Sequence, residues 1–253
     1  MNKKLTYFLQ LLIALTLINF GASCSKKEEK SNAEISYSKA VKLLKQKNYN
    51  SAAEAFIKID DDYPFSKWAL KGQIMAVFAY YKEEDYPKLV QIVDDFLRLN
   101  PANENVPYML YMKGLSYYNQ IPEINRAQDN THLGSSTFRE LIARFPNSFW
   151  SEDAKKRLIY IDEHLAGEKM SIGRYQISQK NYTGAINNFV EVTERYRFTN
   201  QVPEAYFRLI EIYYKIGLNQ ESIAAFRQLK LLFPQNNWTK LAKKIDPVYF
   251  DEK

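Results

Sequence analysis

Apolar residues recur at helical spacing from Glu34 onward. The first set lies on one face of a helix and comprises Tyr37, Ala40, Val41 and Leu44. A polar turn follows at Lys47–Asn50, and a second apolar face starts at Ala52. Pro64 ends this second helix, because proline disfavours helical geometry in the residue before it. The segment therefore predicts a helix-turn-helix unit.

This unit recurs along the chain. The positions that close successive units are Pro64, Pro101, Pro146, Arg197 and Pro234. The interval is 37 residues from Pro64 to Pro101 and again from Arg197 to Pro234, and 45 residues from Pro101 to Pro146. A unit near 34 residues is typical of the tetratricopeptide repeat, and such pairs must stack to bury their apolar faces. The predicted fold is all-α, a tetratricopeptide-repeat α-solenoid of about five helix-turn-helix repeats. Five aligned closures disfavour the alternative, an irregular helical bundle.

Two segments depart from the repeat pattern. Residues 119–134 are polar and predict a loop inserted between the two helices of the third repeat. Residues 151–166 predict an extra or extended helix that starts at Ser151, with acidic residues in its first turn. We therefore expect repeats 1–3 in residues 34–149, the extra helix and repeats 4–5 in 150–236, and a C-terminal tail in 237–253.

The N-terminal residues 1–23 have the composition of a secretory signal peptide. Two lysines precede an apolar run of 13 residues, 8–20, and the small residues Gly21-Ala22-Ser23 follow it. The run is shorter than the ~20 residues that cross a bilayer. Cys24 directly after this zone predicts a lipoprotein, cut before Cys24 and lipidated on its sulfur, although Gly21 stands where an aliphatic residue is usual. A secreted protein with a free thiol remains the alternative. The charged residues 24–33 predict a lipidated flexible tether.

Composition and missing motifs argue against several classes of function. The formal charge of +6 falls to +4 when Lys3 and Lys4 leave with the signal peptide, and it is spread along the chain, which disfavours nucleic acid as a partner. His132 and His164 are the only histidines, too few for a zinc site. The chain has no Gly-rich phosphate loop and no Gly-x-Ser-x-Gly motif. We expect no enzyme, no catalytic residue, no metal and no cofactor.

Several stretches resemble the BamD family, lipoproteins of the β-barrel assembly machinery of Gram-negative bacteria. They are Asp62-Tyr63-Pro64-Phe65-Ser66, Ala79-Tyr80-Tyr81-Lys82, Phe96 to Pro101, Asn105 to Gly114, Phe138 to Ser148, and Arg174-Tyr175 with Asn181-Tyr182. The chain departs from the family at Arg197, where a proline is usual, and in the separation of Arg126 from Asp129. The resemblance implies a non-catalytic scaffold at the periplasmic face of the outer membrane. Ser25 favours that membrane too, since an inner-membrane lipoprotein has Asp there.

The resemblance also implies partners. The C-terminal repeats would bind the barrel-forming assembly subunit, beside other assembly lipoproteins, and the N-terminal repeats would bind C-terminal segments of unfolded outer-membrane proteins. For the substrate groove we expect an aromatic lining with a cation at its edge, formed by Tyr37, Phe78, Tyr81 and Lys82. For the partner interface we expect Arg174, Tyr175, Arg195, Arg197, Glu211 and Tyr214. The alternatives are inter-repeat core for the aromatics and a solvated face for the charged residues.

A second hypothesis shares the fold and the signal. A periplasmic repeat lipoprotein that coordinates cell-wall synthesis through protein docking fits both, although the stretches around Pro64-Phe65 and Tyr108 to Gly114 favour the assembly scaffold. A wall hydrolase would need a further domain, and no unassigned stretch is long enough for one.

Overall fold

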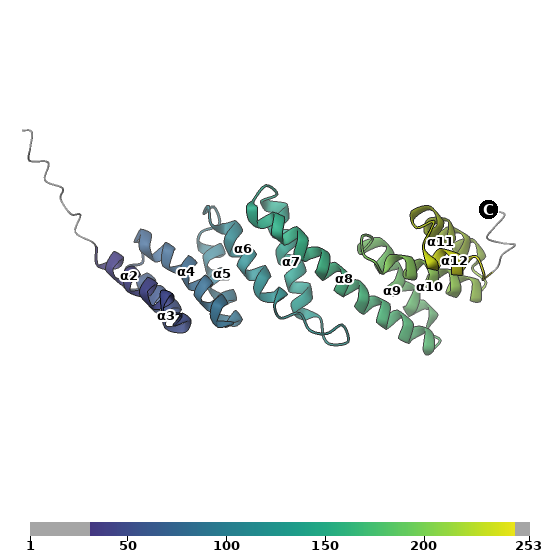
Figure 1. The fold of residues 1–253 in the computed structure, drawn as a ribbon, viewed down its shortest axis with the longest axis horizontal. Helices are drawn as coiled ribbons and strands as arrows, with labels where there is room; N and C mark the ends of the chain where they lie inside the picture. The colour runs from purple at the N-terminus through teal and green to yellow at the C-terminus, as the bar shows by residue number, and fades with distance from the viewer. Residues whose placement is uncertain (1–30, 246–253) are drawn as a thin grey trace, which may run out of the picture.

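The computed structural model describes residues 31–245 as a stack of helices (Figure 1). The predicted signal peptide, Cys24, the tether up to residue 30, and residues 246–253 lie outside the described part. Five antiparallel pairs form the repeats, and one short helix follows them. The pairs are α2 (Asn32–Lys45) with α3 (Tyr49–Asp62), α4 (Lys67–Glu83) with α5 (Tyr86–Leu99), α6 (Val106–Tyr118) with α7 (Asp129–Arg144), α8 (Phe149–Ser178) with α9 (Tyr182–Arg195), and α10 (Val202–Lys215) with α11 (Asn219–Leu232); the short helix is α12 (Asn237–Ala242). The fold is therefore an all-α tetratricopeptide-repeat solenoid.

Local chemistry explains where these helices begin and turn. The Ser66 hydroxyl accepts a hydrogen bond from the Ala69 amide at 3.0 Å, and Ser148 accepts one from Trp150 at 3.2 Å, so both side chains cap a helix N-terminus. The tight turns inside repeats place one residue in the left-handed region, with φ between 59° and 80°. These residues are Lys47, Glu84, Lys180 and Gly217.

The core runs through all the repeats. Each second helix of a repeat buries one phenylalanine almost completely: Phe56, Phe96, Phe138, Phe189 and Phe226. Small residues on the facing helices make room for these rings. A Cβ atom added at Gly173 would lie 2.6 Å from the Phe189 ring, and Gly114 has the same relation to Phe138. Glycine at these positions therefore sets the distance between paired helices.

The three tryptophans of the chain occupy equivalent places. Trp68, Trp150 and Trp238 are each the second residue of a helix that follows a Ser or Asn cap. Each ring meets an aromatic ring of the preceding first helix. The centroid distances are 5.0 Å from Trp68 to Tyr37, 5.1 Å from Trp150 to Tyr108 and 5.0 Å from Trp238 to Phe207. These contacts join the first helices of repeats 1 and 2, those of repeats 3 and 4, and α10 with α12.

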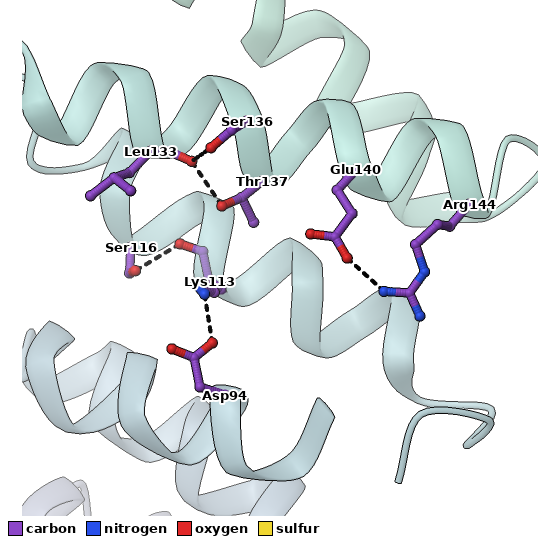
Figure 2. A network of polar contacts seen from close by, with 8 residues as sticks. All are labelled: Asp94, Lys113, Ser116, Leu133, Ser136, Thr137, Glu140 and Arg144. Atoms are coloured by element: carbon purple, nitrogen blue, oxygen red, sulfur yellow. Dashed lines mark hydrogen bonds and ion pairs between the residues drawn. The ribbon is translucent and has the colours of Figure 1, made fainter. Parts of the chain in front are cut away.

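Polar contacts also connect neighbouring repeats. Figure 2 shows Lys113 of α6 directed at Asp94 of α5, with 2.5 Å between the Lys113 Nζ and Asp94 Oδ1 atoms. The Glu140–Arg144 pair at 2.6 Å stays within α7. Asp94, Glu140 and Arg144 are at least 40% exposed, so we assign both pairs a modest contribution to stability.

The structure corrects three boundaries. The inserted loop spans 119–128 rather than 119–134, because α7 already begins at Asp129 and buries Thr131 and Gly134 against its neighbours. The predicted extra helix at 151–166 is part of α8, a single helix of 30 residues that continues into the fourth repeat. Its cap is Ser148, whereas Ser151 is buried and donates a hydrogen bond to the Phe145 carbonyl oxygen at 2.6 Å. Within the predicted tail, residues 237–242 form α12.

The helices alternate in direction, so the stack has two distinct edges (Figure 1). Every first helix of a repeat begins on the same side of the stack as the ends of the second helices, although this edge steps at α8, because the α9–α10 turn contacts Glu163 in the middle of that helix. We call this the inter-repeat edge; the turns inside repeats lie at the opposite edge. Within residues 31–245, no helix is both long and apolar enough to cross a bilayer.

Candidate binding surfaces

An apolar pocket of about 380 Å³ lies across the first helices of repeats 2, 3 and 4. It is lined by Ile74, Met75 and Phe78 of α4, Asn105 and Tyr108 at the start of α6, and Trp150 at the start of α8. Lys82 lies one helical turn after Phe78, with its Nζ atom 5.7 Å from the centre of the Phe78 ring. The pocket therefore offers aromatic and aliphatic walls with one cation nearby. This chemistry suits an apolar or aromatic side chain.

Packing and burial hold the pocket walls in place. The Trp150 ring lies 5.1 Å from Tyr108 and 4.9 Å from Tyr111. Burial raises the pKa of Tyr108 to about 12. The pKa of Tyr111 also rises to about 12, first through burial and then through the 2.6 Å hydrogen bond that its hydroxyl donates to Asp153. Both phenols thus remain neutral at physiological pH.

The predicted substrate-groove residues divide between several places. Phe78 lines the pocket and Lys82 lies beside it. Tyr81 faces a neighbouring region, where its hydroxyl oxygen accepts a hydrogen bond from the Asn119 side chain at 3.1 Å. Tyr37 packs against Phe56 and Trp68 in the first repeat, outside the pocket. The structure therefore brings Phe78 and Lys82 together and separates Tyr37 from them.

Four pocket residues were not predicted from the sequence: Met75, Asn105, Tyr108 and Trp150. One signal was available for Trp150. The Ser-x-Trp spacing at Ser148-Phe149-Trp150 repeats that at Ser66-Lys67-Trp68, and it marks the start of a first helix whose tryptophan faces the previous repeat.

Two of the predicted partner-interface residues, Arg174 and Glu211, belong to one series of linked ion pairs. Arg174 of α8 lies 3.2 Å from Glu204 of α10. Arg208 contacts Glu204 at 3.3 Å and Glu211 at 2.7 Å. This alternating chain, which we call the charged ladder, runs along α10. Its acids already have basic partners, so the ladder presents paired rather than isolated charges.

The remaining predicted residues are not members of the ladder. Arg195 pairs with Glu191 at 3.5 Å near the end of α9. Arg197 lies over the Phe198 ring at 4.9 Å in the α9–α10 turn. Tyr214 is partly exposed near the end of α10. Tyr175 is exposed on α8 and lines a second cavity.

That second cavity, of about 350 Å³, lies where the 119–128 loop meets α8. Gln128 organises the loop, because its side-chain amide donates to the Glu123 and Arg126 carbonyl oxygens at 2.9 Å each. Its side-chain oxygen accepts a hydrogen bond from the Thr131 hydroxyl at 2.6 Å. The buried Gln128 thus connects several parts of the loop.

Comparison with known proteins places this arrangement in a family. A family profile described as outer membrane lipoprotein (YfiO) matches residues 28–243. A relative from Rickettsia prowazekii is 33% identical over 244 residues, which cover 96% of this chain and 97% of the relative. A relative from Caulobacter vibrioides is 32% identical, and the match covers 83% of this chain and 69% of the relative. A relative from Neisseria meningitidis serogroup A is 29% identical, and the match covers 79% of each chain. All three are named outer membrane protein assembly factor BamD. On this match the chain belongs to the YfiO family of outer membrane lipoproteins, together with the BamD assembly factors.

Proposed function

We propose that the protein is a non-enzymatic, lipid-anchored scaffold for the assembly of outer-membrane proteins. The observation that carries the proposal is a match along nearly the whole length of a relative named as an outer membrane protein assembly factor. The solenoid suits the role, because stacked repeats present long surfaces on which several proteins bind side by side. Its place would be the periplasmic face of the outer membrane, held by lipid on Cys24.

Two surfaces divide the binding work in this proposal. The apolar pocket with Phe78 and Lys82 would take an aromatic side chain from the C-terminal segment of an unfolded barrel protein, with Lys82 near its carboxylate. The region of Arg174, Tyr175, Arg197 and Tyr214 would bind the barrel-forming subunit. Arginine and tyrosine are frequent interface anchors.

The first test is purification of the tagged native protein in detergent, followed by mass spectrometry of copurifying proteins and of the N-terminal peptide. We expect a barrel-forming outer-membrane protein and a triacylated Cys24. Copurification of cell-wall synthases in its place would support the alternative, a wall-synthesis coordinator. An unmodified Cys24 would refute the lipid anchor.

The substrate pocket is tested by binding of a labelled barrel C-terminal peptide. Phe78→Ala removes one wall, and we expect about a tenfold loss of affinity, or about 1.4 kcal/mol. Tyr175→Ala is the matched control, since it removes an exposed aromatic ring from a first helix away from the pocket. Equal affinity of the Phe78→Ala variant and the unaltered protein would exclude the pocket as the binding site.

The partner interface is tested by charge reversal. Arg174→Glu together with Arg197→Glu should abolish copurification with the barrel-forming subunit. Arg139→Glu is the control, because the Arg139–Asp162 pair also joins two helices at 2.7 Å and is similarly exposed. Retention of the partner by the double variant would contradict the assignment.

A further inference from the structure

Large apolar side chains project from the inter-repeat edge, with at least one at each repeat boundary. The exposed fractions are 102% for Phe65, 62% for Leu99, 77% for Phe149 and 89% for Phe198. Leu231 and Leu232 occupy the corresponding place at the end of α11. These residues come from five separate repeat boundaries, so packing inside any one repeat does not explain the row.

The opposite edge has a different composition. In repeats 1, 2 and 4 its turns are polar, formed by Gln46-Lys47-Asn48, Glu84-Asp85 and Gln179-Lys180-Asn181. The fifth repeat is mixed, since Ile216 and Leu218 are each 41% exposed. The third repeat also exposes apolar side chains near this edge, since Ile124 is 38% and Leu133 is 44% exposed. The asymmetry between the edges is therefore clearest in repeats 1, 2 and 4.

The inter-repeat edge is also where α2 begins (Figure 1). Cys24 precedes Ser31, the cap of α2, by seven residues. An extended chain of that length reaches at most about 25 Å. If Cys24 carries lipid, this edge starts within that distance of the membrane.

The row suits a lipid surface better than a protein partner. Hot spots of protein interfaces cluster in packed pockets, whereas these side chains are spread over successive repeat boundaries. Exposed Phe and Leu with nearby cations are typical of segments that lie in the membrane interface. Arg197 lies 4.9 Å from the Phe198 ring, and Lys67 is two residues after Phe65.

We propose that the inter-repeat edge rests on the phospholipid surface, with Phe65, Phe149 and Phe198 inserted at the interface. The inference rests on the lipid anchor of the proposed function and adds an orientation, with the solenoid lying edge-on along the leaflet. Asp60, Asp61 and Asp62 at the end of α3 oppose attraction by anionic headgroups. The contact is therefore mainly apolar and should persist at high salt, unlike one driven by surface charge.

The test uses the full lipidated protein reconstituted in phosphatidylcholine–phosphatidylglycerol vesicles. Single cysteines at Phe65→Cys, Phe149→Cys and Phe198→Cys are labelled with a polarity-sensitive fluorophore, and Gln46→Cys and Gln179→Cys serve as exposed controls at the opposite edge. We expect a blue shift and quenching by doxyl-labelled lipid at the three edge positions alone, unchanged at high salt. Water-like emission at the edge positions, matching the controls, would overturn the proposal. Protection that arises only after assembly proteins are added would overturn it too, in favour of a protein interface.

The anchor is tested separately. Lipid on Cys24 blocks its sulfur, so the unsubstituted protein should take up no label; uptake would refute the anchor. The edge is then tested in a Cys24→Ser background by flotation with vesicles. Flotation that Phe65→Ser, Phe149→Ser and Phe198→Ser together abolish would support the edge, and absence of flotation would refute it.

Discussion

At the scale of single residues, aromatic rings combine structural and binding roles. Tyr108 supports Trp150 and also forms a wall of the apolar pocket. The burial of Tyr108 also raises the pKa of its phenol. The effect of this residue on stability should therefore depend on pH.

Tyr108→Phe tests this link. The folded state raises the pKa of Tyr108 from 10.0 to about 12, so its stabilisation is complete below pH 10 and is lost as the pH rises to 12. Because phenylalanine has no proton to lose, the variant should escape about 2 kcal/mol of that loss by pH 11.5. Urea unfolding of both proteins between pH 8 and 11.5 measures the difference. Parallel pH profiles would show that the phenol is solvated in the folded state.

Gly173 tests the spacing between α8 and α9. In Gly173→Ala the new methyl group would lie 2.6 Å from the Phe189 ring, and we expect a loss of about 1–3 kcal/mol from overpacking. Gly134→Ala is the matched control, since its nearest contact, the Ile161 side chain, is 3.5 Å away. Alanine's better helix propensity should leave the control neutral or stabilised by up to about 1 kcal/mol. Thermal unfolding of both variants measures the difference. Equal melting temperatures would contradict the close approach of Gly173 to the Phe189 ring.

At the scale of elements, the 30-residue α8 connects the two halves of the solenoid. Its first half contacts α6 and α7, and its second half pairs with α9. The 119–128 loop lies against its middle, where Ile124 comes within 3.2 Å of a Cβ placed at Gly167. The loop and α8 therefore form one local unit.

Gln128→Ala should release this loop. The substitution removes the side-chain amide that donates to two loop carbonyl oxygens, and we expect faster amide hydrogen exchange in residues 119–128 with little change elsewhere. Asn125→Ala is the control, because the exposed Asn125 only accepts one 3.3 Å hydrogen bond from Ser171. Unchanged exchange in the Gln128 variant would mean that packing alone holds the loop.

At the scale of the whole molecule, each repeat contacts mainly its neighbours. Stability in such an array is approximately a sum of local terms, so damage at one end should remain near that end. This locality would let the apolar pocket and the charged ladder change independently.

Phe56→Ala and Phe226→Ala test locality from the two ends. Each removes a buried ring, and we expect a local cost of about 3–5 kcal/mol. Hydrogen exchange should accelerate in α2–α4 for the first variant and in α10–α12 for the second. Equal acceleration along the whole stack in both variants would show that the solenoid unfolds as one cooperative unit.

The sequence alone determined the fold class, because helical periodicity and recurring closures are local properties of the chain. Ala52 and Phe56 on one face, with Pro64 beyond the end of the helix, define a repeat without knowledge of its neighbours. The family resemblance could also be read from the sequence, because it depended on short local stretches of residues. Element boundaries were harder to predict where burial competes with polarity, as in residues 129–134, which are polar in sequence yet lie in a helix that buries Thr131 and Gly134.

Only the tertiary structure decided which residues share a surface. Met75, Tyr108 and Trp150 are far apart in sequence and meet because successive first helices stack side by side. Tyr37 and Phe78 have similar helical patterns, yet stacking places them in different repeats and only Phe78 in the pocket. The edge formed by Phe65, Phe149 and Phe198 also depends on the alternating direction of the helices. Periodicity indicates which side of a helix is apolar, whereas the packing of neighbouring helices determines which apolar side chains stay exposed together.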